Sequence, residues 1–335
     1  MHRVSLLSAF SAGTVEIRNR VILAPMSGVT DLPFRKLAWR YGAGLTVTEM
    51  VASGELVRDM RESRQRLKGT GARPHIVQLA GREARWMAEA AKIAEGEGAD
   101  IIDINMGCPA KKVIGGYSGS ALMRDPDLAL SLVEATVAAV SVPVTVKMRL
   151  GWDETSLNAP EIARRCEDAG VQMITVHGRT RMQFYEGKAD WDAIRAVRDA
   201  ISLPLIANGD VASADDAEEI LRRSGADAVM VGRASQGQPW LCGKIAGVCE
   251  TPAQAEIADI AEEHYRDMLS FYGVEGGLRH ARKHVGWYLD RHTISMEPAA
   301  RVAIMTSHDP EAVVRGLREA LLSAEDSSAE IGEAA

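Results

Sequence analysis

The chain has 335 residues, which is enough for one large domain and a smaller second one. Hydrophobic residues make up 46% and charged residues 25%, so a sizeable core is possible and wholesale disorder is excluded. The formal net charge of −7 excludes a global basic field that would draw the chain onto nucleic acid, so any such contact must come from local patches.

The four cysteines include no CxxC pair. Scattered thiols of this kind are typical of a reducing cytoplasm and not of a disulfide framework. No apolar run reaches the roughly 18 residues that a membrane helix needs, so we expect a cytoplasmic protein outside the membrane. No metal site is predicted. The cysteines are Cys108, Cys166, Cys242 and Cys249.

The expected elements begin with a hairpin over residues 13–20, followed by the first of eight short apolar runs. Amphipathic stretches such as 83–95 and 214–223 separate the runs, and Ser213 is placed to cap the second stretch. Eight such units between residue 21 and about residue 248 predict an α/β fold, a closed (β/α)8 TIM barrel with the hairpin at its base. An open doubly wound sheet is disfavoured because no GxGxxG follows the first strand. The strands are expected to begin at Val21, Gly44, His75, Asp100, Val142, Met173, Pro204 and Ala228.

Helical periodicity replaces the strand–helix alternation after about residue 250. Residues 251–273, 276–290 and 310–324 are the expected helices, and the composition then becomes acidic and rich in small residues. We therefore expect three parts, in order a catalytic barrel over residues 1–250, a helical-bundle domain over 251–325 and a disordered acidic tail over 326–335.

Nearly every expected strand ends in polar residues, and active sites in this fold lie at the carboxyl ends of the strands. Taken singly, Asn208 is explained as a turn former and Gln78 as a satisfied core amide. Their shared location is what predicts a catalytic face. The strand ends carry Pro25, Met26, Ser27, Glu49, Gln78, Asn105, Cys108, Lys147, Arg149, His177, Arg179, Asn208, Gly209, Asp210, Gly232 and Arg233.

Three strand-end features point to specific chemistry. Gly209, Gly232 and Arg233 follow the last two strands, where backbone N–H groups and a fixed charge favour a phosphate. Lys147 is suited either to hold negative charge on a bound ring or to form a Schiff base, as in a class I aldolase. Cys108 is either a small core hydrophobe or a reactive thiol. The residues alone leave open both this choice and the choice between the two roles of Lys147.

Seven motifs occur in one order between Ala24 and Trp240. They are “APMSGVTDLPFR”, “DINMGCPAKKV”, “GSAL”, “VKMRLGW”, “HGRTR”, “ANGD” and “MVGRASQGQPW”. Together they resemble the bacterial tRNA-dihydrouridine synthases, and “GAGLTVTEM” and “ARKHVGWYL” resemble the B-type branch of that family. The resemblance covers roughly residues 13–290, and an ordered set of long motifs is far more specific than any one of them.

The resemblance implies an enzyme that binds FMN, takes electrons from NADPH or NADH, and reduces the C5–C6 bond of a uridine in the tRNA D-loop to 5,6-dihydrouridine. Cys108 would protonate C5 after hydride from flavin N5 has reached C6. Lys147 would lie at the N1/O2 edge of the flavin and stabilise negative charge on the reduced ring. By motif, the cofactor-binding residues would be Pro25, Met26, Ser27, Gln78, Lys147, His177, Asn208, Gly209, Asp210, Gly232 and Arg233.

Contacts with tRNA are expected from both parts of the chain. Asn105 and Arg179 are candidates for reading the extruded uracil, and Lys111 and Lys112 for binding phosphates, although the “IGGYSG” that follows is neutral where family members often carry basic residues. Gly residues in this segment are expected to let Cys108 move when tRNA binds. The helical domain adds Arg279, Arg282 and Lys283, for which a solvated helix face is the alternative.

Three other functions remain as alternatives. One is a flavin barrel acting on a free pyrimidine, which the helical domain disfavours because a small substrate does not need it. The second is an aldolase that uses Lys147, and the third is a non-enzymatic RNA-binding protein on a barrel scaffold. We expect a monomer without an obligate protein partner. Subfamily resemblance alone suggests tRNA position 17.

Overall fold

The computed structural model describes residues 5–332, and the side chains of residues 5–323. The chain divides into two compact units. The barrel unit contains the chain up to Ala234 together with Leu241–Cys249, and the helical unit contains Ser235–Trp240 and the chain from Glu250 onward. In the described residues no helix is both long and apolar enough to cross a membrane.

The barrel unit is built on one parallel sheet whose strands follow one another in chain order around the ring. The single strand expected from Gly44 is split into β4 and β5, and Val47 between them forms a parallel bridge with Ile76 of β6. Because β3 pairs with both β4 and β11, this bridge closes the sheet and confirms the predicted barrel. The strands are β3 (Val21–Leu23), β4 (Leu45–Thr46), β5 (Val51–Ala52), β6 (Ile76–Ala80), β7 (Ile101–Met106), β8 (Val144–Arg149), β9 (Met173–His177), β10 (Leu205–Asn208) and β11 (Ala228–Val231).

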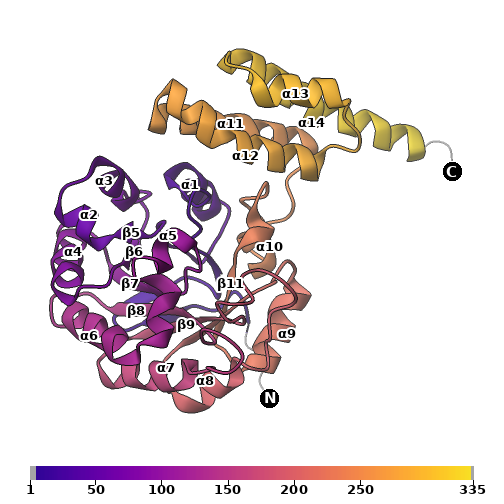
Figure 1. The fold of residues 1–335 in the computed structure, drawn as a ribbon. Coiled ribbons are helices and arrows are strands. Elements are labelled where there is room, and N and C mark those ends of the chain that lie inside the picture. The colour runs from indigo at the N-terminus through magenta and orange to yellow at the C-terminus, as the bar shows by residue number, and fades with distance from the viewer. Residues whose placement is uncertain (1–4, 333–335) are drawn as a thin grey trace. The chain divides into compact units, whose positions relative to one another are not determined.

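Helices surround the sheet, as Figure 1 shows for α2, α4, α6, α7, α8 and α9. The core lies between strands and helices and is rich in Val, Leu, Ile and Ala. Ser213 caps α9 by accepting a hydrogen bond from the Asp216 N–H, as predicted, and Gly225 ends that helix at φ 70°. The helices are α1 (Leu32–Arg40), α2 (Ser53–Val57), α3 (Arg61–Leu67), α4 (Ala84–Gly96), α5 (Lys111–Ile114), α6 (Pro126–Val137), α7 (Ala159–Asp168), α8 (Arg195–Ala200), α9 (Ala214–Ser224) and α10 (Leu241–Ala246), with 3-10 turns η1 (Gly119–Arg124) and η2 (Arg233–Ser235).

A hairpin closes the amino-terminal end of the barrel. It joins β1 (Phe10–Ala12) to β2 (Val15–Ile17), slightly earlier than the predicted 13–20, because Gly13 at φ 58° forms the turn. Ala12 and Ile17 are fully buried among the first residues of the strands. This apolar plug leaves the carboxyl ends of the strands as the open face of the barrel.

The helical unit contains the predicted helices and one that the sequence did not predict, α13. Helix α11 packs against both α12 and α14. Helix α14 continues to Gly332 and so includes residues 326–332 of the expected tail, while 333–335 lie outside the described residues. The helices are α11 (Gln254–Tyr272), α12 (Val274–His292), α13 (Pro298–Thr306) and α14 (Pro310–Gly332).

Candidate active site at the carboxyl ends of the strands

A chain of buried polar side chains crosses the barrel interior from β6 to β8. Gln78 pairs in register with Asp103, and Asp103 with Thr145, so their side chains meet. The Gln78 Nε2 donates to Asp103 Oδ2 at 2.7 Å, and Thr145 Oγ1 donates to Asp103 Oδ1 at 2.6 Å. Burial raises the pKa of Asp103 despite these hydrogen bonds. The network fixes Gln78, whose Oε1 accepts from Asn105 Nδ2 at 2.8 Å.

Cys108 lies just past β7, and three hydrogen bonds fix its backbone. Its N–H donates to Asn105 Oδ1 at 3.0 Å, and its carbonyl accepts from both the N–H and the hydroxyl of Ser120 at 3.0 and 2.9 Å. The thiol is half-buried, and burial raises its pKa above the ordinary value although Lys147 and Arg149 favour the thiolate. The thiol is therefore protonated at neutral pH.

Lys147 stands beside this thiol on β8, in register with Asn105 on one side and Thr175 on the other. Burial and the charge of Arg149 lower its pKa to about 8. The side chain is half-buried, and none of the described residues accepts a hydrogen bond from its ammonium group. A cation held in this way is available to an acceptor group of a ligand.

Arg149, two residues further along β8, is 1% exposed and connects two strand-end loops. Its Nε donates to the carbonyl of Gly107 at 2.8 Å, next to Cys108. Its Nη1 donates to the carbonyls of Thr180 and Phe184, also at 2.8 Å. The loop after β9 is thereby held against the strand end that carries the thiol.

Arg179 organises the other side of the site. It is 1% exposed, and its guanidinium donates to both carboxylate oxygens of Asp210 at 3.0 and 2.7 Å and to the carbonyls of residues 186–187. Its Nη1 also lies 3.3 Å from His177 Nε2. Burial and the charges of Lys147 and its neighbours lower the pKa of His177 well below 6.5, so this imidazole is neutral.

The predicted phosphate region is bounded by the ends of β10 and β11. Burial opposes ionisation of Asp210, but Arg179, the Ala189 N–H and the charge of Arg233 together hold its pKa below the usual value. Arg233 Nη2 reaches Asp210 Oδ1 at 3.3 Å and remains half exposed. Gly209 adopts φ 129°, and a Cβ there would lie 2.6 Å from that of Ala189, so only glycine fits.

The remaining cofactor candidates lie around the same opening. Asn208 Nδ2 donates to the Met230 carbonyl at 2.8 Å, and the Met26 N–H donates to Thr30 Oγ1 at 2.8 Å. A Cβ on Gly232 would lie 3.8 Å from both Ala24 and the Met26 sulfur. Pro25 and Met26 are half-buried and Ser27 is exposed at the end of β3.

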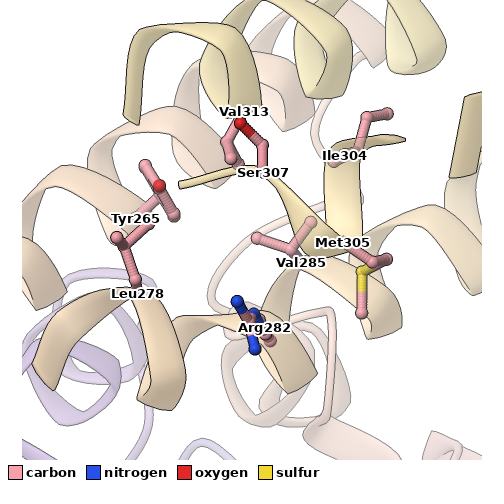
Figure 2. Close-up of a pocket in the computed structure, with 8 residues that line it drawn as sticks. All are labelled: Tyr265, Leu278, Arg282, Val285, Ile304, Met305, Ser307 and Val313. Atoms are coloured by element: carbon pink, nitrogen blue, oxygen red, sulfur yellow. The ribbon is translucent and has the colours of Figure 1, made fainter. Parts of the chain in front are cut away.

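The candidate RNA contacts differ in accessibility. Lys111 and Lys112 are exposed on the short helix α5 after Cys108, where the sequence predicted only a mobile loop. In the helical unit Arg279 is exposed and Lys283 is half-buried. Arg282 instead lines a pocket among the helices of that unit, together with Tyr265 (Figure 2).

Two polar atoms in this pocket are buried without a hydrogen-bond partner, Arg282 Nε and the Tyr265 hydroxyl. Asn105 and Arg179 are likewise buried, at 8% and 1% exposure, and hold other residues of the site. Of the seven predicted RNA contacts, the most accessible are therefore Lys111, Lys112 and Arg279.

Sequence reasoning did not single out Asp103 or Tyr185 as members of the site. Asp103 is a carboxylate inside an apolar run, two residues before Asn105 and so on the same strand face, which was a usable signal. Tyr185 lies in the loop after β9, with Arg233 and Arg149 5.0 and 5.4 Å from its ring centroid. Nothing in its sequence context indicated that position.

Known proteins similar in sequence match nearly the whole chain. A family model described as dihydrouridine synthase matches residues 22–325. A “Probable tRNA-dihydrouridine synthase” of Rhizobium leguminosarum bv. phaseoli is 70% identical over 307 residues, which are 92% of this chain and 96% of that protein. A “tRNA-dihydrouridine synthase B” of Xanthomonas axonopodis pv. citri is 45% identical over 319 residues, 93% of this chain and 96% of that protein.

Among solved structures, “Morphinone reductase” matches with a TM-score of 0.55 at 15% sequence identity. The match covers 75% of this chain and 92% of the other, and it shows a likeness of fold alone. The family match over residues 22–325 and the relatives along nearly the whole chain establish what the motifs predicted. The chain belongs to the dihydrouridine synthase family of oxidoreductases.

Proposed function

We propose that this enzyme reduces the C5–C6 bond of a uridine in the D-loop of tRNA to 5,6-dihydrouridine, with bound FMN and with NADPH or NADH as the electron source. The observation that carries the proposal is the placement of Cys108. Its backbone is fixed at the open face of the barrel, beside the cation of Lys147, in a chain of this family. The position of the uridine within the D-loop, with 17 as our proposal, rests on the B-type relatives.

The residues at the open face fit a flavin mononucleotide. Lys147 offers an ammonium group that no described residue binds, which suits the electron-rich edge of the ring. Gly209, Gly232 and Arg233 would hold the phosphate through backbone N–H groups and charge, while Asp210 fixes Arg233 at 3.3 Å. Pro25, Met26, Ser27, Gln78, His177 and Asn208 would line the remainder.

Hydride for C6 of the uracil is the chemistry that FMN would supply when bound at this face. The negative charge that then develops on the uracil is removed when C5 takes a proton, and a general acid must supply it. Cys108 suits this task because burial keeps its thiol protonated at neutral pH. Asn105 and Ser120 set the position from which the thiol donates.

Binding of tRNA needs local cations, because its phosphates are negative and the formal net charge of the chain is negative as well. Lys111 and Lys112 are exposed three and four residues after Cys108, where they suit phosphates close to the reacting nucleotide. Arg279 and Lys283 offer a second group of cations in the helical unit, and Arg282 lies in the pocket beside them.

The test is direct. Purified protein with FMN, NADPH and tRNA transcribed without modifications should yield a tRNA that is 2 Da heavier, with the change mapped by mass spectrometry of nuclease fragments. A yellow protein that oxidises NADPH but leaves tRNA unchanged would favour a flavin enzyme for a free pyrimidine. A colourless protein that binds tRNA would favour the non-enzymatic alternative.

A further inference from the structure

Two arginines face one indole at the open end of the barrel. The Arg124 and Arg181 guanidinium carbons lie 4.8 and 4.9 Å from the centroid of Trp152. Neither arginine has an acidic partner within the described part of the chain. Of the neighbouring acids, Asp125 caps α6 and Asp153 accepts from the two hydroxyls that follow it, while the exposed Glu154 forms no ion pair with either arginine among the described residues.

Arg124 is exposed, whereas Arg181 is half-buried, with its Nε buried and its Nη1 donating to the Met182 sulfur at 3.2 Å. The pair is therefore a cationic surface on an aromatic base, and Arg124 is its more open member.

An exposed phenyl ring extends this surface. Phe184 is 42% exposed and adopts φ 52°, a conformation that costs free energy for a residue with a side chain. The backbone connects it to the indole, because the Met182 N–H donates to the Trp152 carbonyl at 2.9 Å and the Phe184 N–H to the Arg181 carbonyl at 3.0 Å. We call Arg124, Trp152, Arg181 and Phe184 the Trp152 platform.

The platform adjoins the reacting thiol. Arg149 donates to the Phe184 carbonyl and to the Gly107 carbonyl, each at 2.8 Å, and Gly107 precedes Cys108. On the other side, Asn158 Nδ2 holds the Met123 carbonyl at 2.7 Å, which fixes η1 and Arg124 against the loop of Trp152. These contacts place stacking surfaces and unpaired cations beside the position where the uridine reacts.

We propose that the Trp152 platform binds the unstacked nucleotides that flank the target uridine, with bases stacked on Trp152 and Phe184 and phosphates held by Arg124 and Arg181. The proposal rests on the proposed function, because a uridine can be reduced only after it leaves the base stack, which exposes the faces of the flanking bases. Aromatic rings alternating with arginines are the typical surface for single-stranded nucleic acid.

Single-stranded RNA suits this surface better than a protein partner does. The surface offers single aromatic rings flanked by arginines that no carboxylate pairs with among the described residues, and this combination suits stacked bases with their phosphates. Stacking on an aromatic ring is independent of base identity, so the platform would add affinity for the open loop without selecting its sequence.

The test compares Trp152→Leu and Phe184→Leu with Trp152→Phe and Phe184→Tyr, which keep an aromatic ring. The leucine variants should bind tRNA about tenfold more weakly or worse, and the aromatic variants should recover most of that loss. Arg124→Gln with Arg181→Gln should lower the slope of log affinity against log salt by about 0.7 for each phosphate that the arginines no longer neutralise. Melting temperature and flavin content check that each variant folds.

Matched controls lie at the opposite end of the barrel. The guanidinium carbon of Arg18 lies 3.6 Å from the Trp39 ring centroid, and that of Arg20 lies 5.4 Å from the Phe10 ring centroid. Trp39→Leu and Phe10→Leu therefore remove arginine–aromatic pairs of the same kind. Both controls should bind tRNA like the unaltered protein.

A short single-stranded oligonucleotide should quench the fluorescence of Trp152, and Trp152→Phe should lose this signal. A duplex stem that quenches as well as the single strand would contradict stacking.

Unchanged tRNA affinity in both leucine variants, with the unaltered enzyme active, would overturn the platform while leaving the proposed function intact. If those variants instead lost binding to a protein and not to tRNA, the surface would be a protein interface. An unaltered enzyme that makes no dihydrouridine contradicts the proposed function itself.

Discussion

Asn105 Oδ1 accepts a hydrogen bond from the Cys108 N–H at 3.0 Å, while Asn105 Nδ2 donates to Gln78 at 2.8 Å. One amide thus joins the thiol to the buried network that Asp103 anchors inside the barrel. The position of Cys108 is consequently determined by the barrel interior, and not only by the loop in which it lies.

Replacing Asn105 with Leu should therefore displace the thiol. We expect the rate of dihydrouridine formation to fall at least tenfold, because the hydrogen bonds of the amide to Gln78 and to the N–H groups of Gly107 and Cys108 are all removed. Asn19→Leu is the matched control, since that buried amide also bonds two backbone groups, Gly42 and Val21, but at the closed end of the barrel. Both variants should lose stability by roughly 1–3 kcal/mol. Equal rates in the two would show that Asn105 is only structural.

The thiol of Cys108 should resist alkylation at neutral pH. Burial raises its pKa, and only the thiolate reacts with iodoacetamide, so the rate should stay low from pH 7 to 8.5 and rise above that range. Peptide mass spectrometry of the modified protein measures the rate at each pH. Fast modification at pH 7 would mean that the group is a thiolate at rest and is not suited to donate a proton.

Retention of flavin should depend on the charge of Lys147. Its pKa of about 8 means that the ammonium form prevails below that pH and is lost above it. Flavin retained after ultrafiltration should therefore decline as the pH rises through 8. Lys147→Arg should remove this decline, because guanidinium stays charged, and Lys147→Met should bind flavin weakly at every pH. If the flavin retained by Lys147→Arg declined over the same pH range, a group other than Lys147 would be responsible for the decline.

The helical unit should lose stability in mild acid. Burial lowers the pKa of His264 to about 3, and the unfolded imidazole titrates near 6.5. Between those values the unfolded state binds more protons, so the free energy of unfolding falls as the pH falls, by about 2 kcal/mol for this histidine from pH 6.5 to 5.

Calorimetry of the full chain at pH 7 and 5 measures this effect. His264→Phe should reduce the pH dependence, and replacement of the exposed His308 by Gln should leave it unchanged. The same pH dependence in all three proteins would show that His264 does not become protonated when the chain unfolds.

Much of the barrel could be predicted because strand positions depend on local apolar runs. The runs from His75 and Asp100 became β6 and β7, and the polar residues at their ends reached one face, as parallel strands require. The hairpin was misplaced by a few residues because the left-handed conformation of Gly13 is not visible in an apolar pattern. Helix α13 was missed because Ile304 is its single buried residue, so the segment carries almost no apolar periodicity.

Contacts between side chains were harder to predict from the sequence than strand positions. Arg179 was expected to read the uracil, but it is held by Asp210, 31 residues away, and only the folded chain shows that contact. Arg282 belongs to a basic run that suggests a solvated face, yet it lies in a pocket beside Tyr265. A charge pattern predicts whether a surface is positive or negative, but it does not predict the direction in which each side chain points.

Under the proposed function, Cys108 delivers a proton to uridine in tRNA. The most direct measurement compares Cys108→Ala with the unaltered enzyme in single-turnover reactions, with FMN pre-reduced by NADPH, and counts dihydrouridine in tRNA by mass spectrometry. The alanine variant should still take electrons from NADPH but form dihydrouridine at least a hundredfold more slowly. Dihydrouridine formed by Cys108→Ala at the normal rate would contradict this role of the thiol.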